Sequence, residues 1–236
     1  MNRKKKYLLI DTETANDLDY PLVYGIGYVV TDNTGYIYEK KSFVIRDVFE
    51  WQEMMCSAYY SWKRPLYIQA LRAGTSKLVS FYQARQSILN DMKKYDIDTV
   101  MAYNAHFDIK ALNNTLRYIT SSRYRWFFPY GTKVNCIWHM ACQVLYTQKR
   151  YAVQAIENKW YSEKNNLLTS AEQGKNYIDG VNNFAEEHTG LADVLIETEI
   201  FVACVKKHKK MDRNINRSCW RIPTKKHKEY IKTCLA

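Results

Sequence analysis

The first apolar run of the chain is short and ends in two acids. Residues 7–10 are all apolar, and Asp11 and Glu13 follow them, one residue apart. A run that is apolar at every position predicts a strand buried on both faces in the middle of a sheet. Because side chains alternate along a strand, both carboxylates are expected on the same face, where they repel each other unless a cation lies between them.

The segments that follow predict two more strands and then helices. Residues 23–30 are a strand candidate whose two glycines indicate that another backbone or a ligand lies close, and a third strand is expected over residues 36–45. These three strands are expected to form an antiparallel meander. Apolar residues at helical spacing predict helices over residues 47–60 and 76–95, with a proline and a glycine interrupting the segment between them.

A second buried strand is predicted over residues 98–103, and a helical pattern begins directly after Asn104. Asp108 therefore falls in the first turn of a helix that starts where a strand ends. An acid at that position is stabilised by the helix dipole by roughly 0.3–1 kcal/mol, so Asp108 taken alone has an adequate structural explanation.

The last apolar helix is expected over residues 191–205, with Asp193 in its first turn and His188 in the loop before it. Two other helices are expected between residues 138 and 160. The polar segment over residues 161–183 is interpreted as a loop with one short helix.

The charge of the chain is concentrated at its C-terminal end. Residues 206–236 contain eleven Lys or Arg and two acids, a net charge of +9 out of +11 for all 236 residues. The length predicts one domain over residues 1–205 with a basic extension over residues 206–236. Such an extension attracts polyanions, of which nucleic acid is the commonest, although a solubilising tail is equally consistent with charge alone.

Composition also excludes several classes of protein. No run of 18 apolar residues occurs, and only four apolar residues follow the basic N-terminus before Asp11, too few for a signal-peptide core. We therefore expect a soluble cytoplasmic protein with no membrane partner, and the abundance of Lys, Asn and Tyr suggests a bacterial or phage genome. The six cysteines contain no C-x-x-C pair, which disfavours a zinc site or a disulfide framework.

Three motifs in this order resemble those of one nuclease family. They are Asp-x-Glu at residues 11–13, Asn-x-x-Phe-Asp at residues 104–108 and His-x-x-x-x-Asp at residues 188–193. Together they resemble the DEDDh exonucleases, the DnaQ-like family of polymerase proofreading subunits and RNase T-like ribonucleases, over residues 7 to about 205. The resemblance implies an α/β fold of the RNase H-like type, a mixed central sheet whose first three strands are antiparallel and whose later strands are parallel, flanked by helices.

The resemblance also implies a role for each matching residue. The four carboxylates of the family bind two divalent cations, normally Mg²⁺ or Mn²⁺, and its histidine is the general base; here these are Asp11, Glu13, Asp108, Asp193 and His188. Contacts with the 3′-terminal nucleotide are implied for Thr12, Thr14, Tyr103, Asn104 and Phe107. Tyr103 stands where many members of the family carry His, and its ring can still stack on a base.

The chemistry of phosphodiester cleavage is consistent with these residue types. The reaction needs a nucleophile made from water and relief of the charge on the attacking and leaving oxygens, which two cations about 3.5–4 Å apart supply. A site of Asp and Glu without Cys favours Mg²⁺ or Mn²⁺ over Zn²⁺. A histidine that titrates near neutral pH can accept the proton of the water.

The sequence therefore predicts a metal-dependent 3′-5′ exonuclease that releases nucleoside monophosphates from the single-stranded 3′ end of DNA or RNA, with a polymerase or another replication protein as a possible partner. Two alternatives stay open. One is an endonuclease of the same RNase H-like fold, and the other is a non-catalytic protein that binds nucleic acid through its basic tail.

Overall fold

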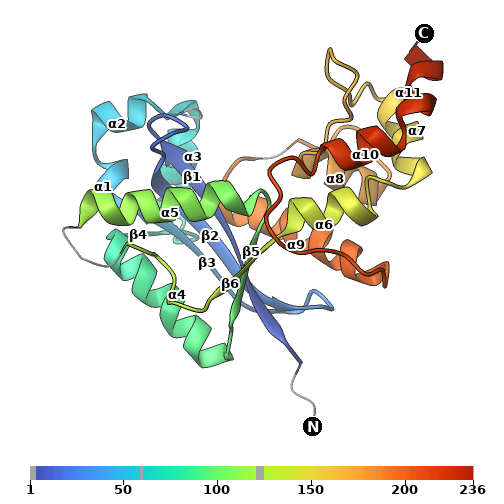
Figure 1. Cartoon of the computed structure of the whole chain (residues 1–236). Helices are drawn as coiled ribbons and strands as arrows, with labels where there is room; N and C mark the ends of the chain where they lie inside the picture. The colour runs from blue at the N-terminus through green and yellow to red at the C-terminus, as the bar shows by residue number, and fades with distance from the viewer. Residues whose placement is uncertain (1–3, 59–60, 121–124, 186, 236) are drawn as a thin grey trace.

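The structure is a computed structural model, and it describes residues 4–58, 61–120, 125–185 and 187–235. Its centre is a six-stranded sheet in the order β4-β3-β2-β1-β5-β6 (Figure 1). The strands are β1 (Lys6–Ala15), β2 (Leu22–Asp32), β3 (Ile37–Ile45), β4 (Lys77–Val79), β5 (Thr99–Ala102) and β6 (Lys133–Cys136). β1, β2 and β3 pair antiparallel, and β4, β5 and β6 join them in parallel, so the predicted mixed sheet is confirmed.

Helices lie on both faces of this sheet (Figure 1). They are α1 (Arg46–Phe49), α2 (Gln52–Cys56), α3 (Arg64–Arg72), α4 (Phe81–Tyr95), α5 (Ala105–Ile119), α6 (Ile137–Val144), α7 (Lys149–Glu157), α8 (Ala171–Asp179), α9 (Gly190–Lys206), α10 (Arg221–Lys226) and α11 (Lys228–Leu235), with a 3₁₀ turn over Ser61–Lys63. Within the described ranges, no helix is both long enough and apolar enough to cross a membrane.

Strand β1 divides the core into two halves. Leu8 and Ile10 pack in the cluster that includes α4 and α5, whereas Tyr7 and Leu9 pack in the cluster that includes α6 and α9. The predicted central strand, buried on both faces, is thus confirmed. Because the odd-numbered residues face α9, the alternation carries Asp11 onto the same side of the sheet as that helix.

Several sequence predictions need correction in the middle of the chain. The helix predicted over residues 76–95 begins only at Phe81, after the short strand β4, because Ser80 and Gln83 form a capping box. The segment thought to be interrupted by a proline forms α3, since Pro65 lies at the start of that helix, where no backbone donor is needed. The helix predicted over residues 47–60 is two short helices, and its last two residues lie outside the described residues.

The later helices agree with the sequence predictions, and the basic C-terminal segment adds two more. The expected helices correspond to α5, α6, α7, α8 and α9. Within the predicted extension, α10 contacts α6 and α11 contacts α7. The division of the chain into a domain ending at residue 205 and an extension stays a prediction.

The start of α9 lies directly on strand β2. A Cβ atom added to Gly27 would lie 2.0 Å from the carbonyl carbon of Gly190, and a Cβ atom added to Gly190 would lie 2.6 Å from the Gly27 nitrogen. Only two glycines allow backbones to approach so closely. The glycines of residues 23–30 were predicted to mark the close approach of another backbone or a ligand, and at Gly27 it is the backbone of α9 that lies close.

Substituting Gly27 should therefore be costly. Gly27→Ala is expected to lower the free energy of unfolding by about 1–3 kcal/mol or more, because the backbone of α9 must move away from β2. Gly25→Ala on the same strand is the matched control. Its added Cβ would meet only side-chain atoms, those of Glu13 and Tyr67, at 3.2 Å, so a smaller loss of stability is expected. Urea unfolding of both variants measures the difference, and equal losses would contradict this account of the Gly27–Gly190 contact.

Candidate active site

One cavity of about 360 Å³ is lined by every site residue that the sequence predicted. It lies where β1 ends, beside the first turns of α5 and α9. The predicted residues that line it are Asp11, Thr12, Glu13, Thr14, Tyr103, Asn104, Phe107, Asp108, His188 and Asp193. Segments separated by more than 170 residues in the chain thus meet in one place.

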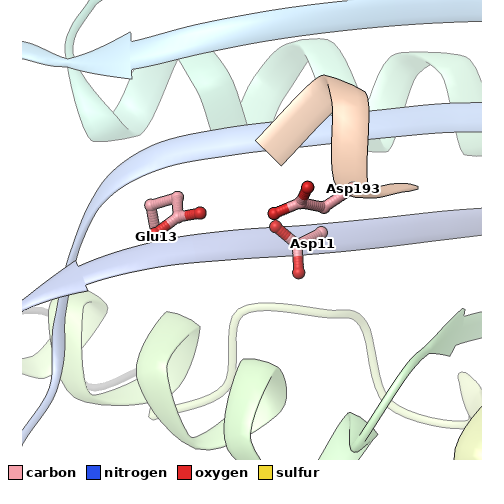
Figure 2. A group of neighbouring side chains, drawn as sticks. All are labelled: Asp11, Glu13 and Asp193. Atoms are coloured by element: carbon pink, nitrogen blue, oxygen red, sulfur yellow. The ribbon is translucent and has the colours of Figure 1, made fainter. Parts of the chain in front are cut away.

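Three carboxylates converge within this cavity (Figure 2). One oxygen from each of Asp11, Glu13 and Asp193 lies within 4.8 Å of the other two. Asp11 is paired across the sheet with Gly27, the residue on which α9 rests. The close approach of α9 to β2 therefore brings Asp193, in the first turn of that helix, beside Asp11.

Asp108 reaches the cavity from α5 and is held by a different contact. Its Oδ1 accepts a hydrogen bond of 3.0 Å from the backbone N–H of Thr12 and one of 2.8 Å from the Thr12 hydroxyl. Asn104 precedes α5 with a φ of 58°, a left-handed conformation that Asn tolerates better than most residues. Asp108 is not part of the group of three oxygens, although its charge contributes to raising the pKa of Asp11.

The carboxyl groups repel one another in a buried setting. Burial raises the pKa of Asp11 well above its ordinary value, and the charges of Glu197 and Asp108 add to this shift. Burial also raises the pKa of Asp108 to about 7, against the opposing effect of the Thr12 hydrogen bonds. It raises the pKa of Asp193 to about 7 as well, although the positive charge of Lys63 opposes the shift. Protons and cations therefore compete for these oxygens.

His188 lies beside the carboxylates in the loop before α9. Its Nδ1 atom is 3.9 Å from Oδ2 of Asp193, and 26% of its side chain is exposed. Burial, followed by the positive charge of Lys63, lowers the pKa of His188 and so favours the neutral imidazole that a general base requires. The backbone φ of 51° at His188 is strained, and the buried Lys63 donates a hydrogen bond to the carbonyl of Glu187 next to it.

Aromatic side chains form another part of the cavity wall. The Tyr103 hydroxyl lies 2.7 Å from that of Tyr146 and donates a hydrogen bond of 2.6 Å to the carbonyl of Thr169. The ring of Tyr103 is thereby fixed, while Phe107 lines the cavity from the first turn of α5. A planar apolar group can pack against such rings.

Sequence reasoning missed four residues of the lining, namely Leu18, Ser170, Ala171 and Glu197, and it missed the neighbouring Lys63. Glu197 carried a signal, because it lies one helical turn after Asp193 and therefore on the same side of α9. The structure buries its side chain, which is only 3% exposed. Lys63 carried none, since its segment lacks a motif and reaches the site only through the tertiary fold.

The donor set fits a hard divalent cation. The cavity offers carboxylate oxygens from Asp11, Glu13 and Asp193 at mutual distances that one ion can bridge. In addition, Oδ1 of Asp193 is buried and accepts no hydrogen bond from the residues that the structure describes. A buried anionic oxygen in that state is costly unless a cation balances it.

No protein-family model matches the chain, and no curated protein matches it by sequence. Among the solved structures that are similar to this chain are several of exonuclease I. The Escherichia coli enzyme in complex with a 5cy-dT13 oligonucleotide is 14% identical with a TM-score of 0.54, over 87% of this chain and 41% of that chain. The zinc-bound form of the E. coli enzyme with single-stranded DNA gives 14% identity and a TM-score of 0.53, over 87% and 41%.

A product-bound structure of exonuclease I is 15% identical with a TM-score of 0.56, over 86% of this chain and 44% of that chain. These similarities show that the chain has the mixed α/β fold that the three motifs implied. The chain spans about two-fifths of the length of the exonuclease I chains that it matches.

The raised carboxyl pKa values predict how stability depends on pH. Asp108 and Asp193 have pKa values of about 7 in the folded chain, against an ordinary value of 3.8. Between these pH values the folded state binds more protons than the unfolded state, so the free energy of unfolding contributed by these groups falls as the pH rises from about 4 to about 7. In chelator, Asp193→Asn should flatten this fall, whereas the exposed Asp19→Asn should not.

Thermal unfolding at pH 5, 6 and 7 measures this dependence, and each kcal/mol should appear as about 2–4 °C in Tm. Mn²⁺ should raise the Tm more at pH 7.5 than at pH 5, because it must displace protons from the carboxyl groups. Wild type and Asp193→Asn profiles that run parallel in chelator would contradict the assignment.

Proposed function

We propose that the protein is a metal-dependent 3′-5′ exonuclease that hydrolyses single-stranded DNA or RNA to nucleoside monophosphates. The observation that carries this proposal is the convergence of Asp11, Glu13 and Asp193 within 4.8 Å, with His188 beside them. Further support comes from the shared fold with exonuclease I, which has been solved with an oligonucleotide and with single-stranded DNA. A polymerase or replication partner stays a prediction.

In this proposal the four acids hold two ions of Mg²⁺ or Mn²⁺. Asp11, Glu13 and Asp193 supply the oxygens that lie together, and Asp108 is kept in place by Thr12. When bound, such ions lower the pKa of water and stabilise the charge on the scissile phosphate. The role of the four carboxylates is to balance the positive charge of these ions and to hold them in position.

The remaining residues move a proton and orient the substrate. His188 accepts the proton of the attacking water, and its lowered pKa keeps the imidazole neutral and ready to do so. Phe107 and Tyr103 line the cavity and offer rings on which the 3′-terminal base stacks. Thr12, Thr14 and Asn104 line the same cavity and contact the terminal nucleotide with polar groups.

Removal of one metal-holding acid tests the proposal directly. Asp11→Ala is expected to lower the cleavage rate by about 10³-fold or more, because a loss of several kcal/mol in transition-state stabilisation corresponds to that factor. Labelled single-stranded DNA and RNA, each with a free or a blocked 3′ end, are incubated with Mg²⁺, Mn²⁺ or chelator. Asp19→Ala, an exposed acid in the loop after β1, is the control.

Wild-type protein should release mononucleotides only from free 3′ ends and only with metal present. Cleavage of substrates with blocked 3′ ends would instead indicate the endonuclease alternative. Asp11→Ala protein that cleaves as fast as wild type would show that the reaction does not depend on this cavity.

The general base is tested by its own substitution. His188→Gln is expected to lower kcat by about 10²–10⁴-fold, the usual contribution of a general base. The Mn²⁺-induced rise in Tm should persist, because the imidazole does not hold the ions. His208→Gln, at an exposed histidine, should leave kcat unchanged. Loss of both kcat and the Mn²⁺ effect would assign His188 to metal binding.

A further inference from the structure

A groove of about 530 Å³ on the C-terminal segment lies outside the active site. It is formed by α10, α11 and the loop before α8, which lie at one end of the molecule (Figure 1). Five of its lining residues are cationic, namely Lys164, Arg221, Lys225, Lys228 and Lys232, and none of the described residues that line it is acidic.

The cations of this groove come as two pairs on successive helices. Arg221 and Lys225 lie four residues apart on α10, and Lys228 and Lys232 lie four residues apart on α11, a spacing that keeps both members of each pair on one side of their helix. All four are exposed, whereas Ile231 and His227 are buried beneath them. The basic extension that the sequence predicted over residues 206–236 thus contains two folded helices whose cationic side chains are exposed.

One aromatic side chain lies among these charges. Trp220 lines the groove, and the Arg221 guanidinium lies 5.1 Å from the centre of its ring. Cations that track a phosphate backbone, combined with an aromatic face for a base, are the elements of a surface for single-stranded nucleic acid. An acidic peptide would use the cations but not the ring.

The groove is also close to the active-site cavity. Asn166 lines the groove, and Ser170, four residues later, lines the cavity. Four extended residues span at most about 14 Å, so Asn166 on the groove and Ser170 on the cavity can be no farther apart than that. The loop is fixed between them, because the backbone N–H of Leu167 donates a hydrogen bond of 3.0 Å to the Thr224 hydroxyl on α10.

We infer that this groove binds the upstream part of a single-stranded nucleic acid whose 3′ end occupies the carboxylate cavity. The inference rests on the proposed function for the position of the 3′ end. A spacing of 3.4 Å per phosphate, as along one strand of duplex DNA, means that about four phosphates cover 14 Å. A 20-nucleotide strand reaches both sites, and a dinucleotide reaches only the cavity.

The test compares Lys225→Gln/Lys228→Gln with Lys40→Gln/Lys77→Gln, a pair of exposed lysines on β3 and β4 outside the groove. Binding of a 5′-labelled 20-nucleotide oligothymidylate is measured in chelator between 50 and 200 mM salt, roughly the range over which counterion release is resolved. The groove variant should bind more weakly, and its slope of log K against log salt should be smaller by about 1.4, since each phosphate contact contributes about 0.7 on single strands. The control pair should match wild type.

The same variants are then assayed with metal. On the long strand the groove variant should show a raised KM and an unchanged kcat, and on a labelled dinucleotide it should match wild type. Binding by the groove variant equal to that of the control pair overturns the inference while leaving the nuclease proposal intact. Absence of cleavage by wild type overturns the nuclease proposal, yet the binding comparison in chelator still reports on the groove.

A competition arm separates nucleic acid from acidic protein. Unlabelled oligothymidylate should displace the labelled strand from wild type, whereas polyglutamate at the same charge concentration should displace it far less, because it cannot stack on Trp220. Equal displacement by polyglutamate would overturn the assignment to nucleic acid.

Discussion

The contact between Gly27 and Gly190 is the constraint on which the site depends. Main-chain atoms of α9 and β2 meet there at a separation that no side chain could occupy. Because Gly27 is paired with Asp11 across the sheet, the same contact fixes the distance between β1 and the first turn of α9. The acids at residues 11 and 193 therefore come together through the packing of backbones, not through any attraction between them.

That packing opposes the electrostatics of the site. Burial and mutual repulsion raise the pKa of Asp11, and burial raises those of Asp108 and Asp193. The apolar clusters on either side of β1 supply the free energy that holds the acids in place. A cavity in which the fold forces carboxylates together has a strong preference for divalent cations once it is deprotonated.

Neutral and positive groups around the carboxylates hold their neighbours in position and shift their pKa values. Thr12 donates two hydrogen bonds to Asp108 from the strand position between the two β1 acids. Lys63 donates a hydrogen bond to the Glu187 carbonyl, and its charge adds to the burial that lowers the pKa of the neighbouring His188. Each arrangement uses a residue from an element distant in sequence, so the site is a property of the whole sheet and its helices.

The sequence alone identified the elements that carry the site and ten of the residues that line it. The apolar run before Asp11, the Asn before α5 and the apolar pattern after His188 have local causes, namely side-chain alternation, left-handed turn preference and helical spacing. The start of α4 and the existence of α3 were mistaken, since a capping box and a proline at a helix start outweigh apolar spacing. Glu197 had a local signal, its place one helical turn after Asp193, but only the packing of α9 made it part of the cavity wall. Only the tertiary structure brought in Lys63 and arranged the basic C-terminal segment as a groove, because these depend on which faces of distant elements pack together, and no local pattern encodes that.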